Sequence, residues 1–115
     1  MKKIRKIVIY KHYFRDFFKS LDEKVKEKFD YVLYLITIAE KIPKKFFKRI
    51  KSVDGLYEIR VESLGNIYRI FCCFDEGKLV VLFNGFLKKS NKIPKQQIEM
   101  AEKLKKEYFN NKQKG

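Results

Sequence analysis

Two arginines in neighbouring strand-like segments are the residues of this sequence best suited to chemistry on a phosphate. Arg60 lies in the segment 56–62, "LYEIRVE", and Arg69 lies in the segment 67–74, "IYRIFCCF". Successive side chains of a strand point to opposite faces, so a turn with an even number of residues places both arginines on one face of a hairpin. A planar guanidinium can hold two phosphate oxygens at once, and a bound phosphate would explain two neighbouring arginines.

Two turns are compatible with this hairpin. With residues 64–65 at the centre, Arg60 stands directly opposite Arg69, and because like charges in that position repel, an anion between them is indicated. With residues 65–66 at the centre, which suits a glycine-first type II′ turn, Glu62 faces Arg69 and a cross-strand ion pair explains the arginine. Both turns keep the two guanidinium groups on one face.

Basic and aromatic residues around the hairpin could bind single-stranded nucleic acid. A basic connector, residues 43–52, precedes the hairpin, and a lysine-rich segment follows the third strand candidate. The candidate contacts are Lys44, Lys45, Lys48 and Arg49 in the connector, Lys88, Lys89 and Lys92 in the later segment, and Phe46, Phe47, Tyr57 and Phe86 as rings for base stacking. Cations along the backbone and rings under the bases are what such a site requires. For each lysine alone a solvated surface charge is the simpler interpretation, so the hypothesis depends on their convergence in space.

The overall charge also indicates an anionic partner. The 115 residues include 28 Lys and Arg against 14 Asp and Glu, which gives a formal net charge of +14 and a pI near 9.8. Such a charge raises the affinity and the association rate for polyanions, nucleic acid above all. RNA, DNA, an acidic membrane surface and an acidic protein are all compatible with the composition alone.

Size and hydrophobic content predict one folded domain over residues 1–115. The hydrophobic fraction of 45%, with 11 Phe and 7 Tyr, is typical of a folded chain, because disordered sequences are poor in aromatic residues. The start of the sequence has no apolar signal region, and no segment approaches the roughly 18 apolar residues of a membrane span. A cytoplasmic protein without a membrane partner is therefore expected.

Metal and cofactor chemistry is not indicated by the sequence. Cys72 and Cys73 are adjacent, so in a strand they point to opposite faces and lack the spacing of metal ligands. The single histidine, His12, lies far from them in sequence, and no glycine-rich phosphate loop is present. We expect both cysteines to be buried apolar residues, and we expect no metal and no cofactor.

The elements that must position these residues follow an α+β order. A β-branched segment at 4–10 predicts a strand, and residues 12–20 predict a short helix. The S-x-x-E capping box at Ser20 predicts a longer helix up to about Lys41. Its apolar stripe is Leu21, Val25, Phe29, Val32, Leu33 and Ile36. The strand candidates that follow are 56–62, 67–74 and 79–83 with an extension towards 88, and a last helix starts at Pro94 and frays over 110–115. We expect an N-terminal strand and two helices packed on a twisted, mostly antiparallel sheet with a three-strand C-terminal meander and a C-terminal helix.

Three motifs give the sequence a family resemblance. "GLYEIRV", "YRIF" and "GFLKK", with the "SNKIPKQQIEMAEKLKKEY" that follows, resemble the toxins of bacterial type II toxin-antitoxin systems, in particular the phage-derived HigB-like branch of the RelE/ParE superfamily. The resemblance covers residues 43–108 well and the N-terminal part only by pattern. It implies a RelE-like fold and ribosome-dependent, metal-free cleavage of mRNA. It also implies a cognate helix-turn-helix antitoxin, contacts with the ribosome and mRNA, and contact with operator DNA only through the toxin-antitoxin complex.

The same resemblance implies roles for five residues. Arg60 corresponds to a strand arginine or lysine that faces the substrate, and Arg69 to an arginine that holds the scissile phosphate. Lys88 and Lys89 lie where relatives keep a basic residue that protonates the leaving oxygen. Glu58 occupies a position that in some relatives is a lysine acting on the attacking hydroxyl, so the general base stays unassigned. A lysine can serve in proton transfer near neutral pH when neighbouring cations lower its pKa.

Two other functions are compatible with these features. ParE-like members of the same superfamily inhibit DNA gyrase and lack the catalytic basic set, and a plain basic module would bind nucleic acid without catalysis. The group Arg60, Arg69, Lys88 and Lys89 favours the ribonuclease. A folded but non-toxic Arg69→Ala variant is expected to separate the ribonuclease from the binding module.

Overall fold

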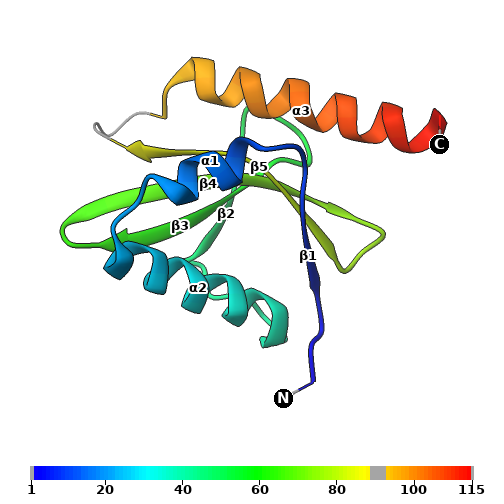
Figure 1. Ribbon diagram of the computed structural model, residues 1–115. Helices are drawn as coiled ribbons and strands as arrows, with labels where there is room; N and C mark the ends of the chain where they lie inside the picture. Colours follow the sequence, from blue (N-terminus) through cyan, green and yellow to red (C-terminus); the bar gives the residue numbers. More distant parts are fainter. Residues whose placement is uncertain (1, 89–92, 115) are drawn as a thin grey trace.

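One mixed β-sheet in the order β1-β5-β4-β3-β2 forms the centre of the protein (Figure 1). The computed structural model describes residues 2–88 and 93–114, and within them the elements are β1 Lys6–Ile9, α1 Tyr13–Lys19, α2 Glu23–Ile38, β2 Phe47–Arg49, β3 Tyr57–Ser63, β4 Asn66–Asp75, β5 Leu79–Lys88 and α3 Lys95–Lys114. β1 runs parallel to β5, and the other neighbouring strands are antiparallel. The predicted α+β class and the three-strand meander are confirmed. Residues 43–52, described above as a connector before the strand candidates, contribute β2 at one edge of the sheet.

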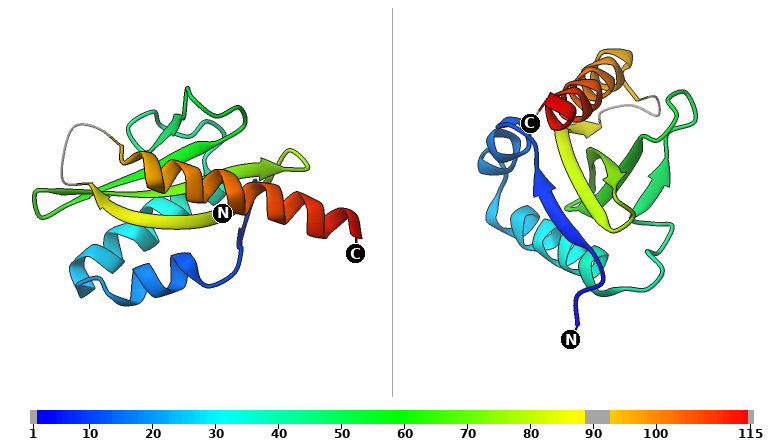
Figure 2. Two further views of the ribbon diagram at one scale, coloured as in Figure 1. Left: turned by 90° about the horizontal axis from the view of Figure 1, so that it is seen from above. Right: turned by 90° about the vertical axis from the view of Figure 1, so that its right-hand side faces the viewer.

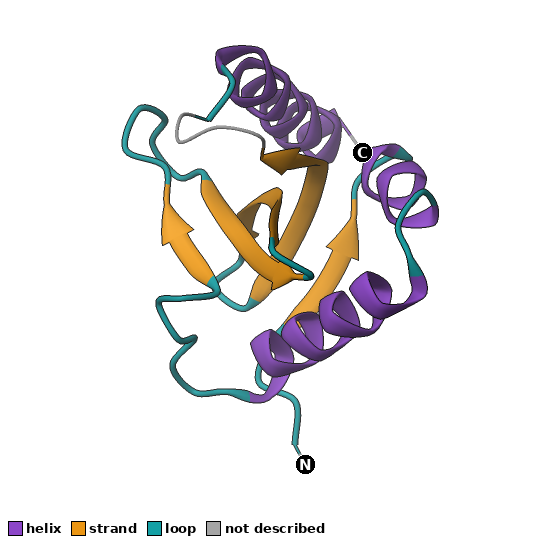
Figure 3. Ribbon diagram, turned by 90° about the vertical axis from the view of Figure 1, so that its left-hand side faces the viewer, coloured by secondary structure: helices purple, strands orange, loops and turns teal. Residues whose placement is uncertain are grey.

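Helices cover both faces of this sheet (Figure 2). α1 and α2 pack on one face and α3 on the other, and Figure 3 shows the strands between α2 and α3. Cys72 enters the core under α2 and Cys73 the core under α3, so the adjacent thiols are buried on opposite faces, as predicted. Burial raises the pKa of both thiols. None of the helices formed by the described residues is long and apolar enough to cross a membrane.

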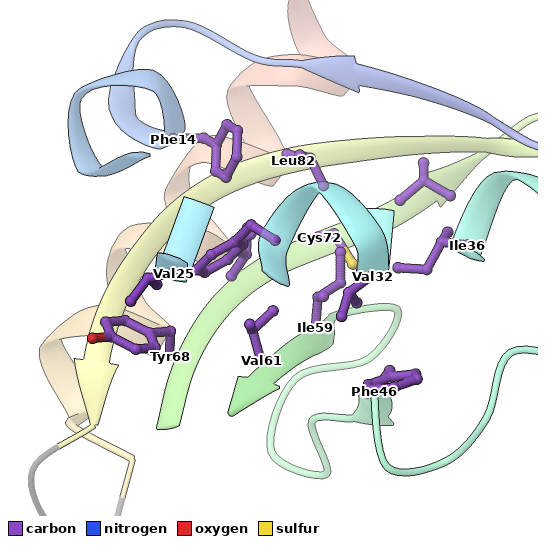
Figure 4. Packing of buried hydrophobic residues seen from close by; sticks show 13 residues of the cluster. Phe14, Val25, Val32, Ile36, Phe46, Ile59, Val61, Tyr68, Cys72 and Leu82 are labelled. Atoms are coloured by element: carbon purple, nitrogen blue, oxygen red, sulfur yellow. The ribbon is translucent and has the colours of Figure 1, made fainter. Parts of the chain in front are cut away.

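The apolar stripe of α2 forms the centre of one core. Val25, Phe29, Val32 and Ile36 are at most 1% exposed, as their spacing of three and four residues predicts. Figure 4 shows Val32 of this stripe beside Ile59 of β3. Because Ile59 is turned towards α2, alternation leaves the residues on either side of it in β3 for the face under α3.

The junction of α1 and α2 differs from the prediction. α2 begins at Glu23, later than predicted, and ends at Ile38, before the predicted end near Lys41. Its N-cap is Asp22. The Ser20 hydroxyl donates to the carbonyl oxygen of Phe17 at 2.7 Å, at the end of α1. The predicted capping box is wrong, because Ser20 bonds back to the helix before it.

The β3–β4 hairpin closes through a two-residue turn at Leu64 and Gly65. The φ angles of these residues are 53° and 80°, and two positive values in succession define a type I′ turn. Of the two turns compatible with the sequence, the structure has the one that places Arg60 directly opposite Arg69.

The backbone of Leu64 is strained in this turn, because a β-carbon clashes with the backbone at positive φ. The leucine side chain is 63% exposed, so its packing does little to offset this strain. Asparagine tolerates this conformation far better. We expect Leu64→Asn to raise the free energy of unfolding by about 1 kcal/mol, measured by urea denaturation. Leu64→Ala is the matched control, since it removes the exposed side chain but keeps the β-carbon. An equal gain in both variants would contradict the strain account.

A polar network fixes α3 to the end of β4. The Tyr108 hydroxyl donates to Asp75 Oδ2 at 2.7 Å, and Lys112 Nζ lies 2.9 Å from each carboxylate oxygen. The carboxylate is buried by α3, since Asp75 is 6% exposed. The helix continues to Lys114, whereas the sequence predicts fraying from residue 110.

Asp75 should make the stability of the fold dependent on pH. Hydrogen bonds from Tyr108 and then Lys112 lower the pKa of its carboxyl below the ordinary 3.8. Its contribution is therefore complete above about pH 4 and is lost as the pH falls through the folded-state pKa. We expect Asp75→Asn to lower the free energy of unfolding by about 2 kcal/mol at pH 7, and this difference to vanish in acid. A difference that stays constant from neutral pH down to strong acid would contradict this assignment.

Candidate functional site

Charged side chains from four strands meet on the face of the sheet under α3. Arg60 of β3 lies opposite Arg69 of β4, and Lys48 of β2 lies opposite Glu58 of β3. The register of β4 and β5 places Lys88 on the same face as Arg69. We refer to Lys48, Glu58, Arg60, Arg69 and Lys88 as the cationic cluster. β-Carbons of directly opposite residues are about 5 Å apart, so the like charges of Arg60 and Arg69 destabilise the hairpin unless an anion lies near them.

The carboxylate of Glu58, a residue of β3, forms an ion pair with Arg69. Arg69 Nη1 donates to Glu58 Oε1, and the two residues are 4% and 3% exposed. The family resemblance implies instead that the Arg69 guanidinium holds the scissile phosphate. Glu58 lies diagonally across the hairpin from Arg69, and at that separation long side chains meet. The ion pair considered for this hairpin therefore exists, but its carboxylate is Glu58 and not Glu62.

Buried polar atoms without a protein partner concentrate in the cluster. Among the residues that the structure describes there are four such side-chain atoms, and three of them are Glu58 Oε2, Arg60 Nε and Arg69 Nε. Most buried polar groups in proteins are hydrogen-bonded, and leaving one unpaired costs about 1–3 kcal/mol. This concentration marks the cluster as the place where the fold retains polar groups at the expense of stability.

Arg60 and Lys88 are partly accessible, and Lys48 is the exposed member of the cluster. The Arg60 side chain is 19% exposed, and its Nη2 lies 3.7 Å from the carboxylate of Glu62, which is itself largely in solvent. Partial burial and the positive charges of Arg69 and Arg60 lower the pKa of Lys88. A lysine with a lowered pKa can give up its proton more readily at neutral pH.

The connector residues divide between the two faces of the sheet. Lys44, Lys45, Lys48 and Arg49 are all exposed. Lys48 lies opposite Glu58 and belongs to the cluster, whereas Arg49 lies opposite Tyr57 and so belongs to the α2 face. Lys45 Nζ lies 4.9 Å above the ring of Phe46, which belongs to the core under α2 and not to the face of the cluster. Of the predicted connector contacts, Lys48 alone joins the cluster.

The predicted stacking rings do not lie open beside the cluster. Phe46 is 8% exposed in the core under α2. Phe47 and Tyr57 stack on each other at 5.2 Å and pack against Phe74 on the α2 face. Phe86 lies opposite Arg69 on the cluster face, but it is 7% exposed. The face that carries the cluster therefore has no open aromatic ring, because alternation sends Phe47 and Tyr57 to the face opposite Lys48, Glu58 and Arg60.

Lys89 and Lys92 lie outside the described residues. Sequence reasoning also overlooked Asn84, a polar residue inside the apolar strand "LVVLFNGF". Its Nδ2 donates to the carbonyl oxygen and to Oε1 of Gln97, at 3.1 and 3.0 Å, and so ties β5 to α3. An asparagine in a predicted central strand is the signal that could have identified this contact.

No metal-ligating group is evident in the described part of the chain. Neither residues 2–88 nor residues 93–114 contain a cluster of three or more His, Cys, Asp or Glu side chains placed to hold an ion. His12 is exposed, and its Nδ1 lies 2.7 Å from Asp16.

The sequence matches the model of a known protein family. Residues 16–106 match the model of a protein family described as "Phage derived protein Gp49-like (DUF891)". This range is more than half of the chain and contains every residue of the cationic cluster. A search of curated proteins finds none that matches.

Proposed function

The chain belongs to the phage-derived Gp49-like family, a RelE/toxin-like family, and from this premise we propose that it is the toxin of a type II toxin-antitoxin system. The proposed activity is ribosome-dependent cleavage of mRNA. The sequence motifs support the HigB-like branch, and the five-stranded sheet with helices on both faces is compatible with a RelE-like fold.

The observation that carries this proposal is the cationic cluster. Lys48, Arg60, Arg69 and Lys88 lie on the same face of the sheet as Glu58, and the two arginines lie directly opposite each other. Such an arrangement destabilises the folded protein, and a polyanion that binds there would offset the repulsion. The net charge of +14 would speed the encounter with RNA.

The proposed reaction transfers two protons. The ribose 2′-hydroxyl attacks the adjacent phosphorus and loses its proton, and the 5′-oxygen leaves with a proton from Lys88. Because Glu58 Oε2 is buried, the proton of the 2′-hydroxyl would pass to solvent or to the ribosome and not to this carboxylate. The products are a 2′,3′-cyclic phosphate and a 5′-hydroxyl. Arg60 stabilises the charge that develops on the phosphoryl oxygens, and the buried ion pair of Arg69 and Glu58 holds together the two strands that carry the cluster. The ribosome would align the strand for in-line attack.

Two partners follow from the proposal. One is a cognate helix-turn-helix antitoxin, through which alone the chain would contact operator DNA. The other is the translating ribosome with its mRNA. We propose no metal and no cofactor for the reaction, because the cluster supplies a proton donor and charge stabilisation.

Inducible expression followed by 5′-end mapping of cellular RNA tests the proposal. We expect growth arrest, new 5′ ends inside translated regions, and relief of both by the neighbouring gene product. Cleaved DNA with intact transcripts would indicate a gyrase inhibitor. RNA binding without new 5′ ends would indicate a non-catalytic basic module.

A further inference from the structure

A second cationic surface lies at the open edge of the sheet, beside β2. A pocket of about 660 Å³ is lined by Lys44, Phe47, Lys48, Arg49 and Lys51. β2 is the last strand of the sheet that the described residues form, so within residues 2–88 and 93–114 no further strand covers this edge. We infer that this pocket binds a nucleobase of single-stranded RNA next to the scissile linkage.

An aromatic ring provides the surface that a base requires. Among the described residues, Phe47 is the only aromatic one that lines the pocket, and it is partly exposed. Its ring is held in place by Tyr57 at 5.2 Å and Phe74 at 5.6 Å. A ring fixed in this way loses little conformational entropy when a base stacks on it. Stacking tolerates every base, because each base has a π-face.

The charge of the pocket fits the backbone of the same strand. Its other four lining residues are all lysine or arginine, and all four are exposed. An aromatic ring bordered by cations is the combination used by proteins that bind single-stranded nucleic acid. An acidic peptide would satisfy the cations, but it would leave the ring without a flat partner. The combination therefore favours RNA.

Lys48 connects the pocket to the cationic cluster. It lines the pocket, it lies opposite Glu58, and its charge contributes to lowering the pKa of Lys88. A strand with its phosphate at the cluster can thus continue around the sheet edge and place a neighbouring base on Phe47. The inference rests on the proposed function, since it assigns this base to the strand that is cleaved.

Binding of uncleavable RNA to the purified full-length chain tests the inference. The probes are a labelled 2′-O-methyl hexaribonucleotide, which lacks the attacking hydroxyl, and an abasic oligomer of equal length. We expect Phe47→Leu to weaken binding of the first probe at least about fivefold and to leave binding of the second unchanged. Phe47→Trp should retain binding of the first probe. Tyr34→Leu is the control, because Tyr34 is an exposed aromatic residue of α2 that does not line the pocket, and it should leave binding of both probes unchanged.

Three results would overturn the inference: parent binding that does not distinguish the two probes, unchanged binding in Phe47→Leu, or an equal loss for both probes. Thermal unfolding of each variant shows whether the fold is retained. The experiment involves no cleavage, so it is independent of the test of the proposed function. A chain that arrests no growth and cuts no transcript would refute the toxin assignment whatever its preference between the probes.

Discussion

Replacing Arg69 by alanine is expected to lower the free energy of unfolding by about 3–5 kcal/mol, because it leaves a buried carboxylate without its counter-ion. Arg69 and Glu58 are 4% and 3% exposed, so water cannot replace the lost partner without opening the sheet. Urea denaturation followed by circular dichroism measures the change. Glu58→Gln should also destabilise the protein strongly, because it leaves the guanidinium buried and unpaired.

A double variant provides the matched control for this prediction. Removing both charges in Arg69→Met with Glu58→Leu restores an apolar environment, and such replacements of buried ion pairs are often neutral or stabilising. We expect the double variant to be more stable than either single variant. Single variants that lose less than about 1 kcal/mol, the range typical of exposed pairs, would contradict the buried pair.

This stability effect changes how loss of toxicity is interpreted. An Arg69→Ala variant that fails to arrest growth can do so because it unfolds, since its ion pair with Glu58 is buried. Arg60 and Lys88 are better probes of the chemistry, since both are partly accessible and neither has a buried ion pair to break.

Arg60→Ala and Lys88→Ala are each expected to slow mRNA cleavage about 100-fold or more. Arg60 would lose charge stabilisation, and Lys88 would lose the proton for the leaving oxygen. Arg60→Ala should not weaken the fold, because it removes a like charge opposite Arg69. Single-turnover cleavage of mRNA on purified ribosomes measures both rates. Arg15→Ala and Lys78→Ala are the controls, each removing one exposed cation outside the cluster.

Much of the fold follows from local patterns in the sequence. The stripe of α2 and the apolar run of β5 are long enough to define a helix and a central strand on their own. The short β2 is different, because three residues in a basic connector carry no usable period, and the strand depends on pairing with β3. The sequence pattern predicts Ser20 as the N-cap of α2, but the same hydroxyl can also bond to the end of the preceding helix, and in the structure it does so.

The candidate site could be predicted only in part. Alternation and the register of the hairpin bring Arg60 and Arg69 together, but the pattern cannot tell which of them is buried. That outcome depends on Glu58, two positions away on the next strand, and on the helix packed over that face. The aromatic residues of β2 and β3 were placed on the wrong face because composition was considered without alternation.

The central claim is that the cationic cluster cuts translated mRNA. Mapping of 5′ ends after expression of the parent, Lys88→Ala and Lys78→Ala at equal protein levels tests it most directly. If the cluster cuts translated mRNA, new 5′ ends should appear within coding regions for the parent and for Lys78→Ala, and they should be lost in Lys88→Ala. New ends of equal abundance in all three, or none in the parent, would contradict it.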